Sequence, residues 1–173
     1  EWDLLKESLK PVRERLRDLD DVEAARARFP NEQDWSRNCP LLEESLLDRA
    51  AGYLEGDQAE NLPTSDEQFL KAQLQRLARR RVERLLEVTL GVADDHMDQF
   101  PPVQARWLTE ALKERLEGPP GAKPLSDSQR ICLELALLTL KDDSTLDELR
   151  ETMLTAEPDI ARLILKRVKP HAS

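Results

Sequence analysis

Aromatic residues, glycine, cysteine and histidine are all scarce in this chain of 173 residues. Aromatic residues make up only 4% of it, so the hydrophobic core must consist mainly of leucine, alanine and valine. Five glycines are few for a sheet protein with tight turns or for a phosphate-binding loop. No segment alternates between apolar and polar residues, and no Asn-Gly or Asp-Gly pair predicts a hairpin.

The scarcity of cysteine and histidine argues against metal and catalytic sites. Cys39 and Cys132 are too few for a disulfide framework and are typical of reduced thiols in an intracellular protein, which we expect in the nucleus or cytoplasm. The cluster Asp94, Asp95, His96, Asp98 has the residue types of a metal site, but not the spacing of a calcium loop or enough His and Cys for zinc. We therefore expect no metal, no cofactor, no catalytic residue and no enzymatic activity.

No apolar run approaches the ~20 residues that cross a bilayer, and we expect no membrane partner. The net charge is −9, and residues 1–63 hold most of it, with 16 acidic and 9 basic residues. This sign disfavours non-specific binding to nucleic acid or anionic membranes. Because the chain begins with Glu1 rather than Met, we expect it to be a fragment of a larger protein.

Leucines at helical spacing predict an all-α fold, an irregular bundle of seven to eight helices. The segment between Pro63 and Pro101 contains no proline and only one glycine, Gly91. It predicts one long central helix over about residues 66–98, against which the shorter helices pack. At the N-terminus, apolar residues separated alternately by three and four positions predict one face of a helix: Trp2, Leu5, Leu9, Val12, Leu16 and Leu19.

The strongest predicted loop is GPPGAKPL, residues 118–125. It divides the chain into a helical bundle over 1–117 and a C-terminal three-helix unit over 126–169, which we expect to pack together as one integrated domain. Ser126 and Gln129 have the spacing of a capping box at the start of the unit's first helix. That helix is apolar on nearly all sides, so we expect it to be buried on several of them.

Five arginines lie in the middle of the predicted long helix, and three of them, Arg76, Arg80 and Arg84, are spaced by four and share a face. This face could be a solvated surface paired with nearby glutamates, a site for an acidic protein partner, or a phosphate-binding ridge. Arg81 falls instead within the apolar stripe, where it needs either an internal carboxylate or a partner. Trp35 lies in a polar loop and either packs on its own domain or anchors an interface.

These observations predict a non-enzymatic protein–protein interaction or scaffolding domain of an intracellular multi-subunit complex. The expected partner is another protein with an acidic or helical surface, and the candidate contact residues are Arg76, Arg80, Arg81, Arg84 and Trp35. The alternative is a nucleic-acid-binding helical domain that uses either the Arg76–Arg84 ridge or a helix-turn-helix-like C-terminal unit. Self-association stays open.

Overall fold

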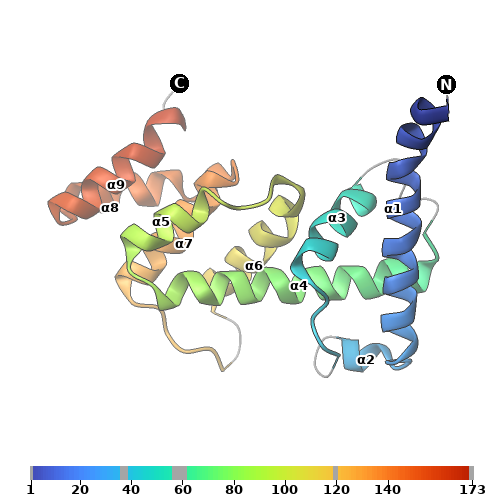
Figure 1. The fold of residues 1–173 in the computed structure, drawn as a ribbon. Coiled ribbons are helices and arrows are strands. Elements are labelled where there is room, and N and C mark those ends of the chain that lie inside the picture. The colour runs from blue at the N-terminus through green and yellow to red at the C-terminus, as the bar shows by residue number, and fades with distance from the viewer. Residues whose placement is uncertain (1, 36–38, 56–61, 119–120, 172–173) are drawn as a thin grey trace. The chain divides into compact units, whose positions relative to one another are not determined.

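The computed structural model describes residues 2–35, 39–55, 62–118 and 121–171. It confirms the all-α prediction, since the regular elements in this part of the chain are all helices and it contains no strand (Figure 1). The α-helices are α1 (Trp2–Ala27), α2 (Glu32–Trp35), α3 (Glu44–Glu55), α4 (Thr64–Glu87), α5 (Leu90–Met97), α6 (Ala105–Glu117), α7 (Asp127–Thr139), α8 (Leu146–Thr155) and α9 (Pro158–Val168). Three 3₁₀ turns join them: η2 (Pro102–Gln104), η3 (Asp143–Thr145) and η4 (Lys169–His171).

Contacts divide the chain into two compact units, Glu1–Leu77 and Ala78–Ser173. The division falls inside α4, so this helix contributes its first part to one unit and its second part to the other. The predicted domain division at 118–125 stays a prediction. We describe each unit by itself.

The first unit has an aliphatic core with one aromatic pair. Trp35 packs edge-to-face on Phe69 of α4, with 5.5 Å between ring centroids and 82° between planes. Gln73 of α4 is fully buried, where its side-chain oxygen accepts from the Leu42 N–H at 3.2 Å and its nitrogen donates to the Trp35 carbonyl at 3.4 Å. The loop before α3 is therefore hydrogen-bonded to α4 by a side chain.

Partly buried ion pairs join α1 to the rest of the first unit. Arg49 of α3 donates two hydrogen bonds to the Asp18 carboxylate, each 2.8 Å long, and the Tyr53 hydroxyl donates a third at 2.9 Å. The hydrogen bonds from Arg49 hold the pKa of Asp18 below its ordinary value, although burial opposes them. Nearer its C-terminal end, α1 is joined to α4 by an ion pair between Arg26 and Asp66.

The second unit is built around α7, as the apolar sequence of that helix predicts. All eight residues from Ile131 to Leu138 are buried, and α7 contacts α5, α6, α8 and α9. Helices α8 and α9 lie side by side, as Figure 1 shows in orange and red. The predicted capping box is confirmed, because the Ser126 and Gln129 side chains each accept the backbone N–H of the other.

The prediction of one long helix over 66–98 is wrong, because α4 ends at Glu87 and α5 begins at Leu90. Thr89 between them is extended, with φ −67° and ψ 154°. Val88, just before Thr89, is half-buried, and Val92 in α5 is exposed. The break therefore turns α5 so that Ala93 and Met97 face the core.

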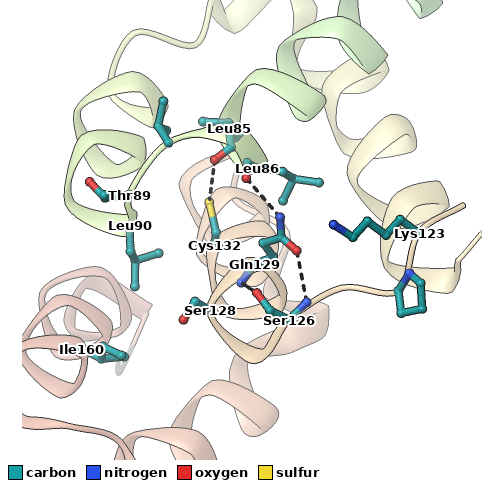
Figure 2. A pocket seen from close by; sticks show the side chains of 12 residues that line it. Leu85, Leu86, Thr89, Leu90, Lys123, Ser126, Ser128, Gln129, Cys132 and Ile160 are labelled. Carbon is teal, nitrogen blue, oxygen red and sulfur yellow. Dashed lines mark hydrogen bonds between the residues drawn. The ribbon is translucent and has the colours of Figure 1, made fainter.

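Side chains of α7 provide the physical reason for the break. In a continuous helix the carbonyls of Leu85 and Leu86 would accept from N–H groups four residues later. Here the Leu86 carbonyl accepts from Nε2 of Gln129 at 3.1 Å, and the Leu85 carbonyl faces the Cys132 thiol at 3.9 Å (Figure 2). The end of α4 thus has hydrogen-bond donors without continuing the helix.

We predict that Gln129→Glu destabilises the protein by about 1–3 kcal/mol in chemical denaturation. The substitution keeps the acceptor that caps α7 but removes the donor to Leu86 and places a carboxylate beside that carbonyl. The control is Ser126→Ala, which loses only the cap and should cost about 1 kcal/mol. Equal effects of the two variants would contradict a separate role for the bond to Leu86.

Candidate interaction surfaces

The arginines of α4 do not form one uniform surface. Arg76 is half-buried, and its guanidinium donates to the carbonyls of Trp35 and Cys39. It therefore fixes a loop of the first unit from inside. Arg80 and Arg84 are exposed, so they are the two members of the predicted ridge whose side chains face solvent. A partner role for the ridge stays a prediction.

Arg81 lies half-buried in the apolar stripe, and Nη1 donates to Oε1 of the buried Gln104 at 2.6 Å. The charge thus has an internal hydrogen-bond acceptor in the Gln104 amide. Gln104 lies in η2, which follows the Pro101–Pro102 pair. The interaction therefore joins α4 to the segment that begins α6.

Two further charges of α4 pair with α6 rather than with their own helix. Arg79 forms a two-bond ion pair with Glu114, at 2.9 and 3.1 Å, and Glu83 accepts from Arg115 at 3.1 Å. Sequence spacing had favoured pairing of Glu83 with arginines one turn away on α4. These exposed pairs are individually weak, but they orient the two helices in the second unit.

Trp35 is buried, with only 5% of its surface exposed. Its indole N–H donates to the Phe29 carbonyl at 2.6 Å. This position agrees with the alternative in which the tryptophan packs on its own domain. A partner could contact Trp35 only after this side chain had left its site, and a partner role for it stays a prediction.

The acidic end of α5 is neutralised by the basic end of α9. Asp94 is buried and accepts from Lys166 and Arg167, each at 2.6 Å, while Arg167 also donates to Asp98 at 2.7 Å. Burial raises the pKa of Asp94, but the hydrogen bonds from both cations outweigh it and hold the pKa below its ordinary value. Basic side chains of α9 therefore compensate the negative charges at the C-terminal end of α5.

This pairing also bears on the proposed DNA-binding use of the last helix. Lys166 and Arg167 are held by carboxylates, and Arg162 pairs with Asp159 one turn away at 3.2 Å. A phosphate would have to displace these partners to reach the three side chains. The arrangement therefore favours a structural role for the basic end of α9.

A half-open groove lies beside the break between α4 and α5, and Figure 2 shows the side chains that line it. Half of them are aliphatic side chains or proline, and the polar groups of Ser126 and Gln129 are already bonded to each other and to Leu86. Burial raises the pKa of the Cys132 thiol to about 11, so at neutral pH it is a poor nucleophile. The groove thus has a mixed apolar and polar lining, and its thiol is not activated.

Acidic, histidine and cysteine side chains do not gather into a metal-binding group of three or more anywhere in the described part of the chain. Both Cys39 and Cys132 are free and buried. Burial also raises the pKa of the Cys39 thiol, against the lowering effect of Arg76.

The most exposed apolar face in the first unit lies on α1. Leu9, Val12 and Leu16 are 39%, 53% and 57% exposed, whereas Asp18 and Val22 on the opposite side of the helix are buried. Sequence spacing identified this apolar face, and we expected it to pack. Sequence spacing did not show that this face points outward. The one available signal was Asp18, a charged residue outside the apolar stripe, which has Arg49 and Tyr53 as partners.

None of the helices within the described ranges is long and apolar enough to cross a membrane. No protein-family model, no curated protein and no solved structure matches the chain.

We predict that Asp94→Asn lowers the free energy of unfolding by about 3 kcal/mol at neutral pH, because it leaves Arg167 without a buried partner. A lowered pKa means that Asp94 stabilises the fold above its unfolded value of 3.8 and that this contribution is lost as the pH falls. The difference between wild type and variant should thus be constant from pH 5 to 8 and shrink below about pH 4. Asp159→Asn, at an exposed pair, is the control and should change little.

Glu134 of α7 gives a prediction of the opposite sign. Burial raises its pKa, Glu148 adds to the effect and Arg130 opposes it. A carboxyl with a raised pKa costs stability as the pH rises from its unfolded value through its folded value. Glu134→Gln should therefore raise the melting temperature at pH 7, on the order of 2 °C, with no gain below about pH 4. Destabilisation at pH 7 would contradict this assignment.

Proposed function

We propose that this chain is a non-enzymatic protein–protein interaction domain, a scaffolding part of an intracellular complex in the nucleus or cytoplasm. The observation that supports it best is the exposed apolar face of α1, formed by Leu9, Val12 and Leu16. Single exposed hydrophobic residues are ordinary on protein surfaces. Three that align over two turns of one helix are typical of a surface that another protein covers.

The free energy gained by burying these three side chains is sufficient for a specific contact. Burying an aliphatic side chain contributes about 1.5–3 kcal/mol, so three together supply about 5 kcal/mol or more before the costs of association. The free, buried cysteines support an intracellular location, where thiols stay reduced. The exposed Arg80 and Arg84 on α4 provide an additional contact of the kind that an acidic protein would use.

Nucleic-acid binding is the less favoured alternative. Of its two candidate surfaces, the last helix has its basic residues paired with carboxylates. On α4, the guanidinium of Arg76 points into its own unit. Two exposed arginines, Arg80 and Arg84, give a weak electrostatic contact in a chain with net charge −9.

We predict that the triple variant Leu9→Gln, Val12→Gln, Leu16→Gln stays folded but loses its partner in affinity capture from cell lysate. Glutamine is a good helix former and the three positions are exposed, so the melting temperature should change little. The readout is the set of proteins recovered with the wild type and absent with the variant, by mass spectrometry.

The matched control is Leu154→Gln with Leu165→Gln, two exposed leucines on α8 and α9. It removes comparable apolar surface elsewhere and should keep the captured set. A captured set that both variants retain would contradict the proposed surface. Recovery of nucleic acid that moderate salt releases would instead support the alternative.

A further inference from the structure

We propose that the partner that docks on the apolar face of α1 is an amphipathic α-helix with acidic flanks. This inference rests on the proposed function and deepens it by stating the chemistry of the partner. It follows from the spacing of the apolar residues, from the charges beside them, and from the way α1 is held in its own unit.

The spacing favours a helix as the bound element. Leu9, Val12, Leu16 and Leu19 are separated by three, four and three positions, and this spacing forms the seam along which a second helix packs knobs into holes. Leu9 and Leu16 are seven positions apart, which corresponds to about 10 Å of helix. A bound strand would need an open backbone edge, and α1 offers none because its backbone groups bond within the helix.

The charges beside the seam are basic. At about 100° per residue, Arg13 lies on one side of the seam, next to Leu16, and Arg15 lies on the other side, next to Val12. Arg17 extends the first side by one turn. Residues 9–17 contain four basic residues and one acidic residue, and that acid, Glu14, falls on the opposite side of the helix.

The excess of basic residues is confined to this part of α1, because residues 1–63 as a whole are strongly acidic. Arg15 also lies over the Tyr53 ring, 5.4 Å from its centroid, so its charge is shared with its own unit. Arg13 and Arg17 are exposed on the other side of the seam. A partner helix with glutamate or aspartate beside its apolar stripe would pair with them.

The same charges argue against a second copy of this chain as the occupant. Two α1 helices packed along this seam would bring basic flanks against basic flanks, and like charges at such contacts are destabilising. Among helical partners, complementarity therefore selects an acidic one.

The test uses two designed helical peptides with the whole chain. Both carry leucine at the seam positions over three heptads, and they differ only in having glutamate or lysine at the flanking positions, so each repels itself and stays monomeric. Binding is measured by fluorescence anisotropy at low and moderate salt. We expect the glutamate peptide to bind at least about tenfold more tightly, with a difference that narrows as salt rises.

Two variants make the result specific. Arg13→Glu with Arg17→Glu should reverse the preference, so that the lysine peptide binds more tightly. The control, Arg150→Glu with Arg162→Glu, makes the same change in net charge at exposed positions of α8 and α9 and should leave the preference as in wild type. The glutamine triple variant of the apolar face should lose binding of both peptides.

Several outcomes would overturn this inference. They are equal affinity for the two peptides, binding of neither, preference for the lysine peptide, or a dimer in light scattering that the glutamine triple variant dissolves. The lysate experiment separates the two proposals. If capture depends on the apolar face but the glutamate peptide is not preferred, the interaction function stands and the acidic helix is wrong as its partner.

Discussion

The hydrogen bond from Gln129 of α7 to the Leu86 carbonyl is the interaction on which the second unit depends. A helix end leaves carbonyls without N–H partners, and burying them unpaired is costly. Gln129 and Cys132 provide donors at the place where α4 stops. This lets the chain turn at Thr89, so that α5 packs on α7 with Ala93 and Met97 inward.

The turn also determines where the acidic end of α5 lies. Asp94 faces the core side of α5 and is buried, so it needs cations that can follow it inward. Lys166 and Arg167 at the end of α9 provide them, since both donate to the Asp94 carboxylate. The break between α4 and α5 thus positions Asp94, which holds α9 through Lys166 and Arg167. These two basic residues therefore form ion pairs inside the second unit.

Sequence reasoning predicted the properties that depend on local pattern. The all-α class, the capping box of Ser126 and Gln129, and the burial of α7 all follow from spacing and side-chain type. The prediction of one long helix failed because the break depends on a hydrogen-bond donor more than forty residues away, Gln129. No local sequence pattern reveals that donor. Arg76, Arg80 and Arg84 share a face by spacing, yet only the fold shows that the first is turned toward the carbonyls of Trp35 and Cys39.

The orientation of α1 has a consequence for what the first unit does. Asp18 and Arg49, with Tyr53, fix which side of α1 faces the unit, and this side is about 160° away from Leu16. Rotating the helix would bury Leu9, Val12 and Leu16, at about 1.5–3 kcal/mol each. It would also break the hydrogen bonds that the Asp18 carboxylate accepts from Arg49 and Tyr53, at a cost of about 1.5–3 kcal/mol. Since the apolar gain is at least comparable to that cost, an outward apolar face gives little advantage to the isolated unit. It becomes favourable when a second protein covers it, because both the ion pair and the apolar burial are then kept.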